Sequence, residues 1–245
     1  MSAMTWAGAV SADNCSLKGM GTDRIPSPIR FNWGVNGPLA RMSVDDRRTA
    51  LVESAYRVIA DHGVEGATTR RICAHAGMPL ASFHYAFESR TALLWAVMEK
   101  AVPEDVSLML ESLLPIGGSS SAVGVEAMRT KMFEQLDAFY MLLKADPGRL
   151  QATISLGIYA HNHPELQPAG KQMYEHLYGL AAQGLAAAGE QAQITWLTPV
   201  EQIAPVFIAN IIAITLVYLS TADDSALGAI AESLVRDVMT HVASR

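Results

Sequence analysis

The chain has 245 residues, a formal net charge of −6, and a composition that is 50% hydrophobic and 17% charged. These values exclude a disordered chain and are typical of a globular protein, with one large core or a small domain joined to a larger one. The two cysteines, Cys15 and Cys73, are too few for a disulfide framework, and Cys73 lies in an apolar helical pattern, so we expect a buried thiol in a cytoplasmic protein.

Charge is distributed unevenly along the chain. Residues 1–102 carry 11 basic and 9 acidic residues, whereas residues 103–245 carry 7 basic and 15 acidic residues. This asymmetry permits an N-terminal module that faces nucleic acid, although the chain as a whole is acidic.

Residues 1–42 contain three prolines and five glycines and show no sustained apolar period, so we interpret them as a flexible N-terminal extension. They lack the basic start and apolar block of a signal peptide. Two alternatives remain: a start-site error, with Met42 as the true first residue, or an arm whose Arg24, Arg30 and Arg41 contact DNA.

Helical patterns begin at Ser43, which is followed by Asp46 at the spacing of an N-terminal cap. Apolar residues then recur at helical period until Gly63, which we expect to end the first helix. Thr68 or Thr69 is expected to cap a short second helix.

The stretch "AGMPLASFHYAF", residues 76–87, places two helix breakers between helical flanks. Gly77 is expected to end the second helix and Pro79 to lie in the first turn of the third. Phe83 and Phe87, four residues apart, share a core-facing side, which leaves polar side chains on the other faces. This spacing indicates a helix-turn-helix, with an ordinary helical hairpin as the alternative.

Beyond residue 102 we find no alternation typical of strands, so the fold class is predicted to be all-α. Helices are expected over 103–114, 123–144, 150–160, 168–189, 199–220 and 225–243, with "ADPGR" as a turn. The run "IAPVFIANIIAITLVYL", 203–219, is 17 residues long and includes Pro205 and Asn210. A membrane span needs about 20 apolar residues, so we expect no membrane span but a helix buried against its own core and a partner subunit.

Residues 43–102 resemble the TetR family of one-component transcriptional repressors, in the register "TTRRI…AGMP…FHYAF.SR.ALL". The resemblance implies a three-helix DNA-binding domain over 43–100 and a larger helical domain for ligand binding and dimerisation over 101–245. It also implies a homodimer that binds double-stranded operator DNA and a small-molecule effector.

Carried over by position, the resemblance implies DNA contacts from Thr69, Arg70, Leu80, Ala81, Ser82, His84, Tyr85 and Arg90. Arg70 is expected to read a base edge, and Thr69, His84 and Arg90 to contact phosphates. The sequence departs from the family pattern at Pro79, Leu80, Ala81 and His84, where serine, a polar residue, glycine and tyrosine are common.

An apolar effector is expected to contact the wall residues Met109, Met128, Met132, Phe133, Phe139 and Tyr140, with His161 at the pocket mouth. The alternative for this stripe is ordinary core packing. The pair His161 and His163 near Glu165 has loose metal-ligand spacing, and we expect a polar helix end instead of a metal site.

Together with these patterns, the resemblance implies a ligand-responsive repressor that is not an enzyme and needs no cofactor. The alternative is a helical carrier of lipophilic ligands, or an enzyme, that retains the helix-turn-helix as a scaffold.

Overall fold

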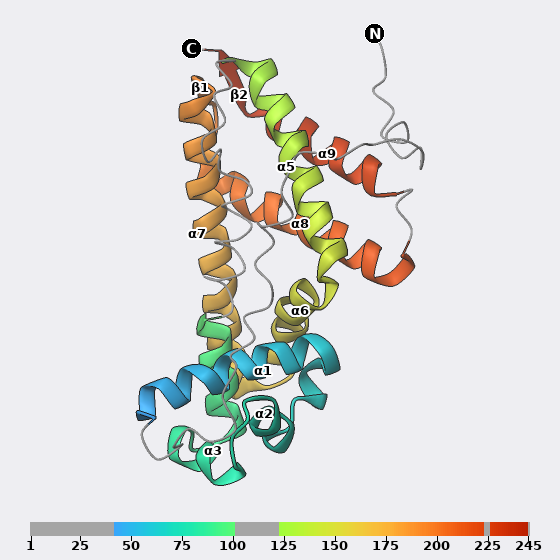
Figure 1. The fold of residues 1–245 in the computed structure, drawn as a ribbon. Coiled ribbons are helices and arrows are strands. Elements are labelled where there is room, and N and C mark those ends of the chain that lie inside the picture. The colour runs from blue at the N-terminus through green and yellow to red at the C-terminus, as the bar shows by residue number, and fades with distance from the viewer. Residues whose placement is uncertain (1–41, 101–122, 223–225, 245) are drawn as a thin grey trace, which may run out of the picture. The chain divides into compact units, whose positions relative to one another are not determined.

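The computed structural model describes residues 42–100, 123–222 and 226–244, and these residues are almost entirely helical, which confirms the predicted all-α class. The N-terminal part contains α1 (Val44–Gly66), α2 (Thr69–His75) and α3 (Leu80–Ala86), followed by a helix over 90–100. These short helices gather beside α1 at one end of the described structure (Figure 1).

The C-terminal part is built from longer helices and a two-stranded sheet. Its elements are α5 (Val125–Ala145), α6 (Pro147–His161), the 3-10 turn η3 (Pro164–Leu166), α7 (Gln167–Gln191), β1 (Ile194–Trp196), α8 (Val200–Thr221), α9 (Leu227–Thr240) and β2 (Val242–Ser244). The helix expected over 103–114 lies outside the described residues. The predicted domain boundary at 100/101 lies at the edge of the same undescribed stretch and remains a prediction.

The sheet is the main difference from the sequence analysis. Strands β1 and β2 pair antiparallel, with Thr195 opposite Ala243, so the last helix ends at Thr240 and does not extend to residue 243. Three-residue strands are too short to show alternation along the sequence, and their pairing depends on a partner about 50 residues away.

Gly63 has a non-helical backbone (φ 71°, ψ 169°), so the first regular helix ends there as expected, and a short helical segment beyond this kink completes α1 up to Gly66. One helix boundary differs from the expectation. The expected turn "ADPGR" is shorter than predicted and consists of Asp146 alone. Pro147 is already the first residue of α6, where its missing N–H is not needed.

A hydrophobic cluster formed by α5, α7, α8, α9 and β1 is the core of the C-terminal part. Met128, Phe139, Leu143 and Leu234 are almost fully buried in it. The long apolar face of α5 therefore packs on the other helices, as expected for an amphipathic helix in a bundle.

The first turn of α6 lies against α1 with no room for a side chain at Gly148. A methyl group added there would come 2.8 Å from the carbonyl oxygen of Ala60 and 3.4 Å from its Cβ. Glycine therefore sets how closely the N-terminal helix α1 and the C-terminal helix α6 approach.

Replacing Gly148 with alanine should destabilise the protein, because the added methyl group must displace backbone atoms. We expect a loss of about 1–3 kcal/mol, as for other overpacked sites, and about 2–4 °C in Tm for each kcal/mol in a chain of this length. Gly179→Ala, at a position in α7 where a methyl group meets nothing within 4 Å, should leave Tm unchanged or raise it. Equal melting curves for both variants would contradict the close approach of α1 and α6.

Candidate nucleic-acid interface

The corner between α2 and α3 is closed by backbone hydrogen bonds. Gly77 adopts the left-handed conformation (φ 64°), and the N–H of Met78 then donates to the carbonyl of Cys73 at 2.8 Å. Pro79 stands immediately before α3 as its N-cap, one position earlier than the first-turn place expected from the sequence. Glycine suits this corner because other residues are strained at positive φ.

Local side chains also cap the entering helices. The hydroxyl of Thr68 accepts the N–H of Arg71 at 3.3 Å, so Thr68 is the cap of α2. The hydroxyl of Ser43 accepts the N–H of Asp46 at 3.0 Å, which confirms the cap predicted for α1.

The inner side of the corner is apolar. Ile72, Cys73, Phe83 and Phe87 are buried, and the two phenylalanine rings lie 6.0 Å apart between centroids. Burial raises the pKa of the Cys73 thiol, which agrees with the inert, buried cysteine expected from the sequence. The predicted core-facing side of α3 is therefore confirmed.

The outer side of the corner is exposed and holds most of the predicted DNA contacts. Tyr85 is 75% exposed and Leu80 41%. Arg70, Ala81 and His84 are exposed, whereas Thr69, Ser82 and Arg90 are partly buried. One continuous turn-and-helix surface thus presents these side chains, and their contacts with DNA remain predictions.

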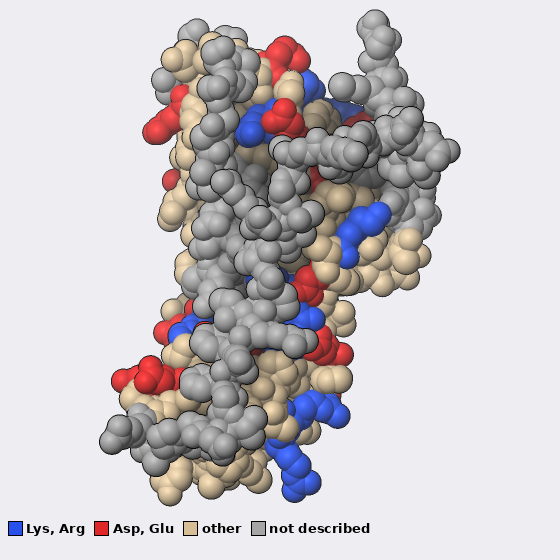
Figure 2. All heavy atoms as spheres, in the orientation of Figure 1, with Lys and Arg blue, Asp and Glu red and all other residues tan. Residues whose placement is uncertain are grey.

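Charge on this end of the molecule is mixed and includes projecting basic side chains. Figure 2 shows Lys and Arg side chains at the lower end of the face drawn, with acidic groups beside and above them. The adjacent Arg70 and Arg71 on α2 are both exposed. Such a local basic surface on an acidic chain suits an electrostatic contact with phosphates.

Arg90 makes contacts that the sequence analysis did not foresee. Its guanidinium donates to the carbonyl of Ala67 (3.0 Å) and to the carbonyl of Val64 at the end of α1. It also donates to the hydroxyl of Tyr159 on α6 (3.0 Å) and lies 5.5 Å from the centroid of that ring. Arg90 therefore joins the DNA-proximal helices to α6, and a phosphate contact would have to compete with these partners.

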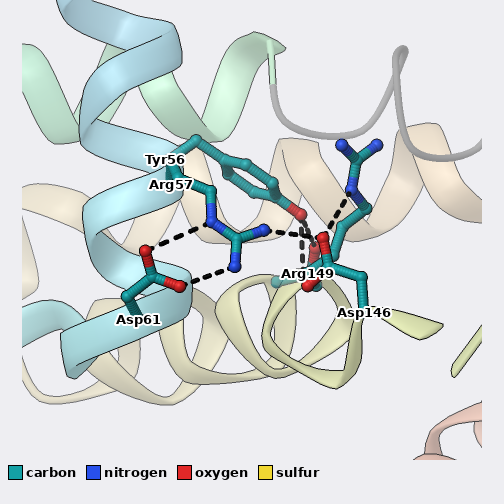
Figure 3. A network of polar contacts seen from close by, with 6 residues as sticks. Tyr56, Arg57, Asp61, Asp146 and Arg149 are labelled. Carbon is teal, nitrogen blue, oxygen red and sulfur yellow. Dashed lines mark hydrogen bonds and ion pairs between the residues drawn. The ribbon is translucent and has the colours of Figure 1, made fainter. Parts of the chain in front are cut away.

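A second polar junction links α1 with the start of α6 (Figure 3). Arg57 on α1 donates to Asp61 on its own helix and to Asp146 before α6, each at 2.6 Å. The hydroxyl of Tyr56 donates to the backbone carbonyl of Arg149 at 2.7 Å. Both ends of α6 are thus connected to the N-terminal helices.

The hydrogen bond from Arg57 lowers the pKa of Asp61, and the hydrogen bond to Asp61 raises the pKa of Arg57. A lowered carboxyl pKa stabilises the fold above the ordinary pKa of aspartate, and this contribution is lost as pH falls through the lowered value. Because both groups are largely exposed, the effect on stability is small.

The predicted effector residues fall into three groups. Met128, Met132 and Phe139 are buried in the C-terminal core, and Phe133 and Tyr140 are partly buried against it. His161 is exposed at the end of α6, away from the α5 stripe in sequence, and Met109 lies outside the described residues.

His163, just beyond the end of α6, takes part in an aromatic contact and a backbone contact. The His163 ring stacks on Tyr159 with centroids 3.8 Å apart, and its Nδ1 lies 2.8 Å from the Tyr159 carbonyl oxygen. Within the described ranges, no group of three or more His, Cys, Asp or Glu side chains is placed to hold a metal ion.

A capped helix, a glycine corner and an exposed short helix over an aromatic core define a helix-turn-helix DNA-binding protein. Comparisons with known proteins agree. A family model for bacterial regulatory proteins of the tetR family matches residues 51–97. Over these residues the chain is similar to the TetR family of bacterial regulatory proteins.

Two characterised regulators are similar to parts of the chain. The nicotine-responsive transcriptional repressor HdnoR of Paenarthrobacter nicotinovorans is 28% identical over 155 residues, which cover 63% of this chain and 75% of HdnoR. The transcriptional regulator PksA of Bacillus subtilis is 32% identical over 75 residues, which cover 29% of this chain and 37% of PksA.

A solved structure shares the fold at low identity. The putative TetR-family regulator from Mesorhizobium loti superposes with a TM-score of 0.62 and 13% identity, over 82% of this chain and 99% of that chain. The likeness therefore includes the C-terminal helices and is not limited to the helix-turn-helix.

Substitutions of two tyrosines compare the junction between α1 and α6 with the exposed surface of α3. Tyr56→Phe removes the hydrogen bond to Arg149 and should cost about 0.5–1.5 kcal/mol of unfolding free energy, or a few degrees in Tm. Tyr85→Phe, which alters an exposed ring on α3, should leave Tm unchanged. A thermal melt of both variants beside the wild type measures this difference, and a wild-type Tm for Tyr56→Phe would show that the junction adds no stability.

Proposed function

We propose that the protein is a homodimeric repressor that binds a palindromic operator in the cytoplasm and is released by a small, mostly apolar effector. The observation that carries this proposal is the exposed side of α2 and α3, which presents Arg70, His84 and Tyr85 over the buried Phe83–Phe87 corner. The similarity to a nicotine-responsive repressor supports both the repression and the small effector.

In this proposal α3 enters the major groove and α2 supports it from the N-terminal side. Arg70, at the start of α2, donates to a base edge, and His84, on α3, contacts a phosphate. Leu80 and Ala81 offer only apolar contacts, for example to the methyl group of thymine. Two such surfaces in a dimer would meet half-sites about one helical turn, or about 34 Å, apart.

Dimerisation is assigned to the outer face of α8. This face carries Val206, Ala209, Ala213, Leu216 and Ser220, spaced by three and four residues, and Val206 and Leu216 are 47% and 43% exposed. An apolar stripe with small residues at this spacing suits close packing against a helix of a second chain.

A membrane is the other environment that would cover α8. The helix is long and apolar enough to cross one, with a mean hydropathy of 2.2 and 28% of that window buried in the structure. The core helices of soluble proteins pass the same test, and α8 contacts α7, α9 and α6 along its length. These contacts support a helix that is shared between its own core and a partner chain.

The effector is assigned to the apolar side of α5. Phe133 and Tyr140 are partly buried against the C-terminal cluster, and the Tyr140 ring meets Tyr218 of α8 edge-on with centroids 5.7 Å apart. Aromatic and methionine side chains suit an apolar ligand, and the acid excess of residues 103–245 disfavours a small polyanion.

Release from DNA is assigned to α6. Arg90–Tyr159 and Arg57–Asp146 tie its two ends to the N-terminal helices, while its other contacts reach α5, α7 and α8. An effector that favours a different position of α6 therefore favours a different spacing of the two α3 helices, and operator DNA weakens effector binding by the same factor.

The proposal is tested with the DNA upstream of the protein's own gene. Wild-type protein should shift this fragment in a gel, and compounds found by a thermal-shift screen should release it. Turnover of a bound compound by a protein that binds no DNA would instead support the helical enzyme or carrier.

Single substitutions separate base reading from phosphate contact. Arg70→Ala should cost about 1–3 kcal/mol with the cognate fragment and relax discrimination at one base position in each half-site. His84→Ala should weaken cognate and random DNA alike, because phosphate contacts carry no sequence information. Circular dichroism controls for folding, and wild-type affinity in both variants would disprove the assignment of these residues to the interface.

The dimer is tested by a charge on the exposed face of α8. Val206→Glu should yield monomer or aggregate, because an unpaired carboxylate in a buried seam costs several kcal/mol. Val44→Glu makes the same substitution at a position on α1 that is 54% exposed and should leave the mass unchanged. Light scattering at low micromolar concentration measures the molar mass of both variants. A stable dimer of Val206→Glu would show that this face of α8 is not the interface.

A further inference from the structure

The DNA-facing helix α3 is only seven residues long and has few partners at its ends. A helix this short is unstable alone. Its last carbonyl groups receive no hydrogen bond from an N–H group of the same helix. At its N-terminal end Pro79 provides no side-chain cap. Its position must therefore be fixed by other elements.

Arg48 of α1 supplies a contact at the C-terminal end of α3. Its Nη1 donates to the carbonyl oxygen of Ala86, the last residue of α3, at 2.8 Å. A guanidinium at this position also suits the negative end of the helix dipole. The contact joins α1 and α3 across 38 residues of sequence.

The same guanidinium lies over an aromatic ring. The Arg48 Cζ is 4.3 Å from the centroid of Phe87, which is only 3% exposed although Arg48 itself is exposed. The Phe87 ring neighbours Phe83, whose ring meets His84 edge-on with centroids 5.6 Å apart. A line of ring contacts thus leads from Arg48 to a side chain on the outer surface of α3.

The surroundings of Arg48 do not suit a phosphate. Asp45 and Asp46 occupy the first turn of α1, so the helix start beside Arg48 carries two carboxylates. The Phe87 ring and the carbonyl of Ala86 also hold the guanidinium in place. Both contacts use the planar group with several donors that only arginine provides.

We propose that Arg48 is a positioning residue that fixes α3 on α1 and so sets sequence discrimination without contacting DNA. This inference rests on the proposed role of α3 in DNA binding. Its first consequence, a looser α3 without Arg48, holds in the free protein and is measured without DNA.

The experiment compares full-length wild type with Arg48→Gln, Arg48→Lys and, as a control, Arg236→Gln at an exposed position on α9. Hydrogen exchange reports the stability of α3 in the free protein, since local opening sets the exchange rate of its amides. Arg48→Gln should speed exchange across 80–87 about tenfold and leave exchange in α7 unchanged. Arg48→Lys keeps the charge without the planar fork and should be intermediate, whereas Arg236→Gln removes one charge from another helix and should match the wild type.

DNA binding is then measured with the upstream fragment and with a random duplex of equal length over a range of salt. Arg48→Gln should lower the ratio of cognate to random affinity about tenfold, with the salt slope unchanged because no phosphate contact is lost. If Arg48→Gln fails to fold, Arg48→Lys decides through the same two measurements.

Three results would overturn the inference. They are unchanged exchange of α3 in both Arg48 variants, a salt slope reduced in Arg48→Gln by about one unit per half-site, and equal effects from Arg236→Gln. If α3 loosens but the wild type binds neither DNA, the proposed function fails while the positioning of α3 by Arg48 stands.

Discussion

The contact between α1 and the first turn of α6 is the constraint on which the rest of the described structure depends. Gly148 allows the two backbones to approach, and the Arg57–Asp146 pair and the Tyr56 hydroxyl hold them in register. The exposed ion pair alone adds little stability, so the close backbone packing must account for most of the effect. Without this contact, α6 would lose its packing on α1 at its first turn, and Arg90 with Tyr159 would still hold its other end.

The helix α1 has two separate tasks along its length. Its first turns meet α3 through Arg48, and its middle meets α6 through Tyr56 and Arg57. At the far end of α6, Arg90 bonds to the end of α1 and to Tyr159. α1 therefore connects the surface assigned to DNA with the domain assigned to the effector, through contacts on both sides of its kink at Gly63.

Local chemistry allowed much of this fold to be predicted. The caps at Ser43 and Thr68, the glycine corner at Gly77 and the buried faces of α3 and α5 follow from residues within one or two helical turns. The contacts of Arg48, Arg57 and Arg90 with other elements could not be predicted, because those partners lie 23 or more residues away in sequence. The strands β1 and β2 were not predicted for the same reason. The placement of Met128 and Phe139 in the core depends on packing among four helices.

The distribution of contacts around α6 matters for anyone who recombines regulators. A chimera cut between residues 100 and 101 follows the sequence boundary, but it separates Tyr56, Arg57 and Arg90 from the helix they hold. A foreign effector domain joined there would bring its own version of α6, with no reason for a glycine opposite Ala60. A chimera should therefore transfer the C-terminal domain together with the face of α1 that packs on α6.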